Sequence, residues 1–365
     1  MTRLSELGES HVLSRILGHN RDGAHVIVGP GDDAAVTALS GNLVSTADML
    51  VENEDFTRDW LDWHRLGIKA AAQNLADVCA MGAVPHGLLV SLAVPDDTDI
   101  ADLEALFTGI LAEASRAGSE LGCEVPIVGG DLSSSGLIVV AITALGTVGP
   151  GAALTRSGAR PGDAIHLAGT VGRAAAGLDL LFARDELRER ALSEITAPDP
   201  ASTVRSRLTD TGEPELARLI AAQLAAQPDY AAVPRMAGRA SAMIDVSDGL
   251  STDLRRIADA SGVHAALESA ALDELVDDLM PAVRFLFGDG TDAEDRAAPG
   301  SAAARREFAL EWVLNGGEDH GFVATAAPDL PPPVGWRRIG EVTAGSGLSL
   351  DGDDLPTSGF SHFGK

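Results

Sequence analysis

The sequence predicts a two-domain protein of the α/β or α+β class. Its 365 residues exceed the roughly 100 to 200 of an ordinary domain, so we expect two domains, each with its own core. Segments with strand and helix patterns alternate in both halves, as they do in a mixed fold. A Gly-Pro-Gly break at 149–151 is the natural boundary, which gives expected domains at 1–150 and 151–365.

In the first half, the hydrophobic pattern predicts helices and strands in a regular order. The expected elements are a helix over 4–17, strands over 25–28 and 42–46, a helix over 60–81, a strand over 88–94, a helix over 99–121, a strand ending at 129–131 and a strand over 137–148. In the 60–81 helix, small and apolar residues from Ile68 to Cys79 recur every three or four positions, and Gly82 ends the helix. Asn74 and Asp77, three residues apart, share another face of that helix.

In the second half, two polar turns follow apolar segments. The expected elements are a strand over 163–168, a helix from 173 to about 183, helical sequence within 185–227, a strand over 242–244, a helix ending near 262 and a surface insertion over 288–306. The strand over 242–244 leads into Asp-Val-Ser-Asp-Gly at 245–249, and Asn-Gly-Gly-Glu-Asp occupies 315–319. Both turns bring carboxylates to the end of an apolar element.

Composition excludes several classes of protein. There are 54 acidic and 27 basic residues, so a fold that grips nucleic acid through a basic surface is not expected. The uncharged stretches 78–95 and 132–155 are interrupted by Gly and Pro and are too broken for the roughly 20 apolar residues of a membrane span, so they are expected to be buried strands. Cys79 and Cys123 form no CxxC pair and the N-terminus has no signal-peptide pattern, which favours the cytoplasm.

The acids that could carry chemistry lie beside small or turn-forming residues. They are Asp32, Asp33, Asp48, Asp77, Asp131, Asp245, Asp248 and Glu318. Each alone is typical of a turn or a helix cap. Carboxylates that gather in space need cations between them, and hard oxygen ligands suit Mg²⁺ or Ca²⁺. Mg²⁺ can in turn bridge to nucleotide phosphates, which Arg156, the Gly129-Gly130 backbone and the helix start at Arg173 could also contact.

Competing nucleotide and hydrolase motifs fail on particular residues. A Walker A loop needs Gly-Lys-Ser/Thr, whereas the only lysines are Lys69 and Lys365. The formal GxGxxA match at 29–34 places two carboxylates where a dinucleotide pyrophosphate would lie. The turn at 245–249 resembles a GxSxG elbow, but its acids would oppose a serine alkoxide. His320 belongs to no HExxH motif, so a zinc protease is not expected.

Seven blocks in a fixed order resemble the thiamine-monophosphate kinase family. They are Gly31-Asp32-Asp33, Ala47-Asp48, Asn74-Leu75-Ala76-Asp77 with Met81-Gly82-Ala83, Gly129-Gly130-Asp131, Leu154-Thr155-Arg156-Ser157-Gly158, Asp245-Val246-Ser247-Asp248-Gly249-Leu250 and Gly316-Gly317-Glu318-Asp319. The segment 359–363 extends the match to nearly the whole chain. The resemblance implies an aminoimidazole ribonucleotide synthetase-like fold, with an N-terminal mixed sheet that dimerises and binds ATP and Mg²⁺, followed by a C-terminal α/β domain.

The resemblance also implies an activity and a role for particular residues. The activity is transfer of the ATP γ-phosphoryl group to thiamine monophosphate, which gives thiamine diphosphate and ADP in a homodimeric enzyme. The implied Mg²⁺ site comprises Asp33, Thr46, Ala47, Asp48, Asp77, Asp131, Asp245 and Asp248. The implied ATP contacts are Gly130, Asp131, Arg156 and Ser247, and the implied catalytic residues are Asp245, Asp248 and Arg156. Asp55, Glu318 and Phe360 would contact the thiamine substrate.

Some positions depart from the family pattern and leave alternatives open. Asp55 stands where relatives commonly have histidine, and Phe360 stands where an aromatic residue with a polar edge is often found. The stretches 185–227 and 288–306 exceed the compact family core. One alternative is a nucleotide-binding regulator without catalysis, although no site carboxylate is missing. Another is a related ATP-dependent synthetase acting on an amide or selenide, although the N-terminal region has no reactive Cys or Lys.

Overall fold

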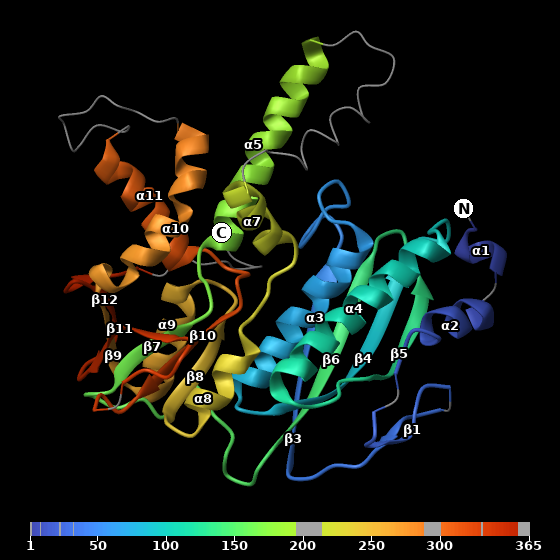
Figure 1. The fold of residues 1–365 in the computed structure, drawn as a ribbon, viewed down its shortest axis with the longest axis horizontal. Coiled ribbons are helices and arrows are strands. Elements are labelled where there is room, and N and C mark those ends of the chain that lie inside the picture. Colours follow the sequence, from blue (N-terminus) through green and yellow to red (C-terminus); the bar gives the residue numbers. More distant parts are fainter. Residues whose placement is uncertain are drawn as a thin grey trace. The chain divides into compact units, whose positions relative to one another are not determined.

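The computed structural model describes residues 2–7, 9–21, 23–31, 33–194, 214–287, 301–329 and 331–356 (Figure 1). The chain divides into two compact units. Unit 1 comprises Met1–Arg156, Pro228–Asp245 and Pro333–Gly335, and unit 2 comprises Ser157–Gln227, Val246–Pro332 and Trp336–Lys365. Unit 1 therefore includes two segments that follow much later in the sequence.

Unit 1 contains a four-stranded mixed sheet with the order β3-β6-β4-β5. Its strands are β3 (Asn42–Val51), β4 (Val84–Val94), β5 (Ile127–Ser134) and β6 (Val139–Val148). β6 pairs antiparallel with β3 and β4, whereas β4 and β5 are parallel. The long helices α3 (Trp63–Ala80) and α4 (Ile100–Leu121) lie along one face (Figure 1). Burial alternates along β6, which is the pattern of a sheet with one covered face.

The N-terminal helices and hairpin complete this unit. They are α1 (Leu4–Leu7), α2 (Glu9–Leu17), β1 (Val26–Val28) and β2 (Val36–Thr37).

The long helices α3 and α4 begin and end at residues that are typical of helix caps. The Asp62 side chain accepts the N–H of Arg65 at 2.8 Å at the start of α3, and Asp99 accepts the N–H of Ala101 at 3.0 Å at the start of α4. Gly122, in the left-handed region at φ 69°, ends α4.

Helices α3 and α4 cross with their backbones in contact. A Cβ atom added at Gly67 would overlap the carbonyl oxygen of Leu106, and one added at Gly109 would overlap that of His64. The two glycines therefore allow an approach that no larger residue permits. This crossing fixes the position of α3, the helix that carries Asn74 and Asp77.

Unit 2 is built on a seven-stranded sheet whose last strand, β8, brings the chain in from unit 1. The order is β13-β12-β9-β11-β7-β10-β8. The strands are β7 (Ala164–Ala168), β8 (Ala240–Val246), β9 (His264–Leu267), β10 (Gly321–Ala326), β11 (Trp336–Thr343), β12 (Gly347–Leu350) and β13 (Asp353–Asp354). The helices are α5 (Arg173–Glu194), α7 (Pro214–Leu224), α9 (Leu250–Ser261), α10 (Ser269–Phe287) and α11 (Ala302–Asn315). Every residue of β7 and of β10 is buried, which places the core on both faces of the sheet centre.

Three strands are longer than the sequence pattern predicted. β3 continues to Val51, β5 to Ser134 and β8 to Val246. Asp48, Asp131 and Asp245 therefore lie inside strands, and the prediction that the strands end before Asp48 and Asp245 and at Asp131 was wrong. The physical reason is that a strand on a sheet edge or near a functional site tolerates polar residues. In a hydrophobic pattern, such a residue is typical of the end of a strand.

Two predicted boundaries also differ for helices. The single helix expected over 4–17 is divided into α1 and α2. The expected surface insertion over 288–306 overlaps α11, which begins at Ala302 after a Ser301 cap and buries Arg305. The remainder of that insertion, 288–300, lies outside the described residues, as does 195–213 of the helical sequence expected over 185–227.

The later segment of unit 1 is anchored on α4 by a buried tyrosine. The segment continues through the short helices η1 (Tyr230–Ala232) and α8 (Val233–Ala237) into β8. The hydroxyl of Tyr230 donates to Oε1 of Glu113 at 2.8 Å, and the Arg116 guanidinium lies 4.6 Å from the ring centroid. Burial, followed by the Glu113 charge, raises the pKa of Tyr230, so the hydroxyl remains a donor. Unit 1 thus holds the segment that leads to Asp245.

A buried histidine in β7 should make the protein acid-sensitive. His166 is buried, its Nδ1 has no hydrogen-bond partner, and burial lowers its pKa below the ordinary 6.5; a backbone hydrogen bond at Ala164 opposes this shift, and the charge of Arg338 adds to it. The unfolded chain therefore binds a proton near pH 6.5 that the folded chain resists. Stability is complete above this pH and falls as the pH decreases toward the folded-state pKa, by up to about 1.4 kcal/mol per pH unit. His166→Leu should reduce the loss of melting temperature between about pH 7.5 and about pH 5.5.

The exposed His11 provides the control for this experiment. His11→Gln, a replacement at an exposed position, should retain the wild-type dependence of melting temperature on pH. An identical acid dependence in wild type and His166→Leu would contradict the assignment.

Candidate functional site

Thr46, Asp48, Asn74 and Asp77 form a connected polar group between β3 and α3. Thr46 Oγ1 donates to Asp77 Oδ2 at 2.6 Å, and the backbone N–H of Asp48 donates to Asn74 Oδ1 at 3.0 Å. The buried Asn74 is itself oriented by its Nδ2, which donates to the carbonyl of Ala70 at 2.9 Å. Thr46 and Asp48 are two residues apart and share one face of β3. The predicted neighbours Thr46, Asp48 and Asp77 are therefore brought together, with Asn74 as their support.

The strand register places Asp131 on the other face of this sheet. Asp48 pairs with Ile142, Ile142 with Val90, and Val90 with Gly130, so Gly130 shares the cross-strand row of Asp48. Asp131 belongs to the next row and, like Ala47 on β3, its side chain has the opposite direction. Asp131 and Ala47 are both exposed. The residues expected to form one metal site are thus divided between two faces of the sheet.

The glycine pair before Asp131 has a packing role. A Cβ atom at Gly130 would overlap the carbonyl oxygen of Val90 on β4, and one at Gly129 would lie 3.0 Å from the Leu89 side chain. Gly130 therefore allows the close approach of two parallel strands. This requirement is sufficient to explain the residue type, independently of any phosphate.

The chemistry of these donors fits a hard cation. The groups available are carboxylate and hydroxyl oxygens, without thiolate or imidazole, and Mg²⁺ is usually held by one or two carboxylates together with water and substrate phosphates. Within the part of the chain that the structure describes, no three His, Cys, Asp or Glu residues lie close enough to hold a metal ion. The donor set therefore fits Mg²⁺ that phosphate oxygens help to hold, and does not fit a closed protein cage.

In unit 2, the loop between β8 and α9 is organised by Asp253, which the sequence analysis did not identify. Asp253 Oδ2 accepts the backbone N–H of Ser247 at 3.0 Å and that of Asp248 at 2.9 Å. Its Oδ1 pairs with Arg256, whose other terminal nitrogen contacts Asp248 Oδ2 at 2.6 Å. Burial alone would disfavour the charge of Arg256, but these two carboxylates raise its pKa. The only sequence signal for Asp253 is an acid in the first turn of a helix.

The Gly-Gly-Glu-Asp turn packs directly against this loop. The N–H of Glu318 donates to the carbonyl of Ser247 at 2.8 Å, and the N–H of His320 donates to that of Val246 at 3.1 Å. A Cβ atom at Gly317 would overlap the Ser247 carbonyl oxygen, so a larger residue would separate the two turns. Glu318 is in the left-handed region at φ 70°, a conformation that few non-glycine residues adopt. Ser247 and Glu318, predicted separately, are therefore neighbours.

Asp319 caps α5 and occupies the place considered for an anion. Its carboxylate accepts the hydroxyl of Thr170 at 2.9 Å and the backbone N–H groups of Arg173 and Ala174 at 3.2 and 3.0 Å. Burial raises the pKa of Asp319, and these hydrogen bonds oppose the shift. The guanidinium of Arg173 pairs with Asp278 at 2.7 Å. The suggestion that this helix start binds a phosphate was wrong, because a protein carboxylate already satisfies its donors.

The other predicted residues lie in a turn, at exposed positions or in a strand. Asp55 Oδ2 accepts the N–H of Val51 at 2.8 Å and closes the turn after β3. Asp33 and Arg156 are exposed. Asp245 is buried in β8, two residues after Met243, whose N–H donates to the carbonyl of Thr155 at 3.1 Å. Asp32 and Phe360 lie outside the described residues.

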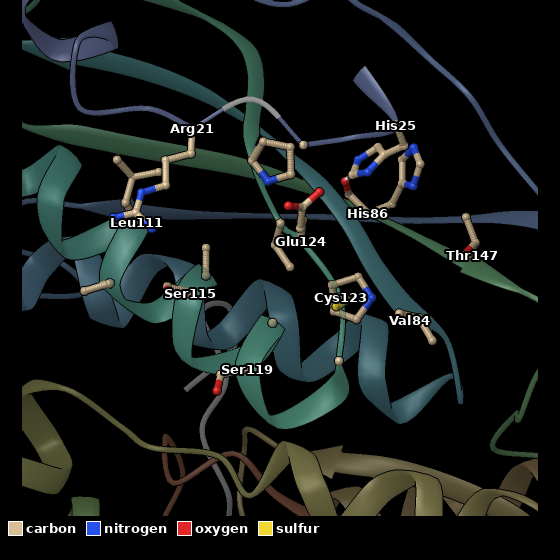
Figure 2. A pocket seen from close by; sticks show the side chains of 18 of the residues that line it. Arg21, His25, Val84, His86, Leu111, Ser115, Ser119, Cys123, Glu124 and Thr147 are labelled. Atoms are coloured by element: carbon tan, nitrogen blue, oxygen red, sulfur yellow. Dashed lines mark hydrogen bonds between the residues drawn. The ribbon is translucent and has the colours of Figure 1, made fainter. Parts of the chain in front are cut away.

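A pocket of about 1000 Å³ lies elsewhere in unit 1 (Figure 2). The rings of His25 and His86 lie 4.0 Å apart at one end, Arg21 lies beside Leu111 at the other, and Glu124 lies between them. None of the predicted site residues lines it. The pocket is therefore separate from the polar groups described above.

Comparison with known proteins identifies the family. Residues 31–148 match the family model described as AIR synthase related protein, N-terminal domain. A thiamine-monophosphate kinase of Mycobacterium tuberculosis is 38% identical over 99% of this chain and 93% of its own length.

Solved structures show the same likeness over the full length. The thiamine-monophosphate kinase of Stenotrophomonas maltophilia K279a covers 95% of this chain, with 96% of its own chain matched, at 28% identity and a TM-score of 0.69. A structure described as AaThiL complexed with AMPPCP and TMP covers 100% of this chain, with 99% of its own matched, at 28% identity and a TM-score of 0.67. The expected fold class is confirmed, and the chain belongs to the thiamine-monophosphate kinase family.

Proposed function

We propose that this protein transfers the γ-phosphoryl group of ATP to the phosphate of thiamine monophosphate, which yields thiamine diphosphate and ADP. The observation that carries the proposal is the 38% identity to a thiamine-monophosphate kinase over 99% of the chain. The direct packing of Glu318 against Ser247 supports it, because two of the seven blocks are thereby joined in one structure. ATP is the co-substrate, consistent with AMPPCP in the complex of AaThiL.

Mg²⁺ is proposed as the metal, held by phosphate oxygens together with those residues of the predicted set that share the α3-facing side of the unit 1 sheet, Thr46, Asp48 and Asp77, and by Asp245 and Asp248. When bound, it would neutralise the charge of the phosphates and so allow two anions to react. The chain's own contribution is to orient the donors. Asn74 and Thr46 fix Asp48 and Asp77 in unit 1, β8 carries Asp245, and the loop between β8 and α9 holds Ser247 and Asp248.

Donors of the chain would contact the phosphates directly. Since the N–H of Ser247 is engaged by Asp253, its hydroxyl is the group available for a phosphate. The exposed Arg156 would supply a charge-assisted contact, and Gly130 and Asp131 would lie at the nucleotide. Phosphoryl transfer of this kind requires in-line positioning and charge neutralisation, and no covalent intermediate with the protein. The catalytic roles therefore fall to Asp245, Asp248 and Arg156.

The acceptor contacts are proposed for Asp55, Glu318 and Phe360. The two neighbouring acids have different partners, since the Glu318 carboxylate accepts the amide of Gln223 at 3.5 Å whereas the Asp319 carboxylate caps α5. Glu318 would attract the cationic thiazolium ring of the thiamine substrate. Phe360 would stack on an aromatic ring of the same substrate.

The proposed assembly is a homodimer formed through the sheet of unit 1. The face opposite α3 and α4 carries exposed apolar side chains, among them Leu43 at 55%, Met49 at 57% and Val84 at 43% exposure. Leu43 and Val84 both pair with Thr147 and so form one cross-strand row. An apolar patch of this kind on a sheet face is typical of a protein interface, and a second copy would provide a matching surface.

Met49→Glu is expected to convert the dimer to a monomer, because each copy would bury a carboxylate in the proposed interface without a partner. Light scattering coupled to size exclusion should report half the wild-type mass at about micromolar concentration. Val334→Glu, at an 81% exposed loop position, should leave the mass unchanged. A dimer that tolerates Met49→Glu would exclude this face as the interface.

The activity is tested by incubating the protein with ATP, MgCl₂ and thiamine monophosphate and separating the products by chromatography. Formation of thiamine diphosphate in equal amounts with ADP supports the proposal. ATP binding without product would favour the non-catalytic regulator. ADP release with another acceptor and not with thiamine monophosphate would favour a different synthetase.

The proposed compartment is the cytoplasm. The free cysteines Cys79 and Cys123 suit this setting. A separate finding is that no helix of the described residues is long and apolar enough to cross a bilayer.

A further inference from the structure

Asp253 is a buried charge with partners in the loop that precedes it and in its own helix. It is fully buried in the first turn of α9. One carboxylate oxygen accepts the N–H groups of Ser247 and Asp248 at 3.0 and 2.9 Å, and the other pairs with Arg256. The loop backbone therefore turns inward toward Asp253.

This arrangement restricts the loop to one conformation. An ionised carboxylate buried without partners costs several kcal/mol, and here three donors offset that cost. If the N–H groups of Ser247 and Asp248 turned away, the Asp253 charge would lose two of its partners. The loop is thus stabilised in the conformation in which both N–H groups point toward Asp253.

Arg256 extends the restraint to a side chain. Its second terminal nitrogen lies 2.6 Å from Oδ2 of Asp248, so one guanidinium joins the carboxylates of Asp248 and Asp253. Planar guanidinium groups hold carboxylates in a defined orientation. The same contact places a positive charge beside Asp248 in the absence of any metal, which reduces repulsion among the acids of the site.

We propose that Asp253 is a positioning residue which, through the loop backbone and Arg256, holds the Ser247 hydroxyl and the Asp248 carboxylate in the orientation that binds a metal nucleotide. This inference rests on the function proposed above. Neither Asp253 nor Arg256 belongs to the predicted set, and neither is assigned a contact with substrate.

Asp253→Asn tests the inference. The amide has one acceptor oxygen and places an NH₂ group against donors, so it cannot satisfy both N–H groups and the guanidinium. We expect the affinity for Mn²⁺-ATP, measured by electron paramagnetic resonance at a temperature well below the melting point, to fall about tenfold. The Mg²⁺ concentration for half-maximal turnover should rise to a similar extent, while KM for thiamine monophosphate remains close to that of wild type.

Asp259→Asn is the matched control on the same helix. Asp259 is 65% exposed and pairs with Arg255 at 3.7 Å, so its loss should change neither metal-nucleotide affinity nor the Mg²⁺ requirement. If Asp253→Asn lowers only the melting temperature and binds Mn²⁺-ATP as wild type does, Asp253 has a purely structural role and the inference is overturned.

A second pair of variants decides the matter if Asp253→Asn does not fold. Arg256→Gln removes the bridge to Asp248 and should weaken Mn²⁺-ATP binding about threefold or more, with Arg256→Lys retaining part of the affinity. Wild-type affinity in Arg256→Gln would overturn the bridging role. A wild-type protein that binds Mn²⁺-ATP but makes no thiamine diphosphate would disprove the proposed function, and the binding comparison would still test the positioning role.

Discussion

Replacing Asp245 with asparagine is expected to lower turnover about 100-fold or more while the protein remains folded. Asp245 is buried in β8, immediately before the loop that carries Ser247 and Asp248. Asparagine has nearly the same shape but no charge, so it preserves packing and removes a ligand for Mg²⁺ and a counter-charge at the proposed site. The rate should therefore change far more than the melting temperature.

The measurement is steady-state turnover as a function of Mg²⁺, together with thermal unfolding. Asp97→Asn, at an exposed position that belongs to no predicted site, should be indistinguishable from wild type. Unchanged turnover of Asp245→Asn at limiting Mg²⁺ would refute the assignment. A large fall in melting temperature with an unchanged rate would indicate that the carboxylate serves the fold alone.

Gly67→Ala is expected to destabilise unit 1 by about 3 kcal/mol or more, because the new methyl group would overlap the carbonyl oxygen of Leu106. Relief requires α3 and α4 to separate, and α3 carries Asn74 and Asp77. We therefore expect a lower melting temperature and weaker binding of Mg²⁺-ATP from one methyl group placed far from any reacting atom.

Gly136→Ala is the natural control, since no atom lies within 4 Å of the added Cβ. Its free energy of unfolding should remain within about 0.5 kcal/mol of wild type. If Gly67→Ala were as stable as Gly136→Ala, the close crossing of the two helices would be incorrect.

The parts of the fold that follow from local chemistry could be predicted from the sequence. The helix expected over 99–121 is α4, Ile100–Leu121, because Asp99 caps its start and Gly122 ends it. The lengths of the strands were predicted less accurately than the bounds of this helix. β3 contains Asp48 and β5 contains Asp131, and a polar residue in the sequence pattern indicates the end of a strand. Which face of the sheet each carboxylate occupies depends on register, and register is a property of strands far apart in the sequence.

The candidate site shows the same limit. The sequence identified acids beside small residues, and the structure joins Thr46 with Asp77 and Ser247 with Glu318. The sequence alone could not distinguish Asp319 from its neighbour Glu318. Asp319 caps the helix that begins at Arg173, and its capping partners lie more than a hundred residues away in the sequence. Supporting residues are therefore recognised only when the surrounding hydrogen bonds are known.

The tyrosine anchor on α4 has a consequence for how the protein is made. Glu113 lies in the first part of the chain to leave the ribosome, but Tyr230 and the segment Pro228–Asp245 are synthesised much later. Until then, the nascent unit 1 has an uncovered apolar surface and a Glu113 carboxylate without its tyrosine partner. A chain stalled after Arg156 is thus an incomplete domain and a natural client for chaperones. Completion of unit 1 is a late event in synthesis, even though its sheet is encoded first.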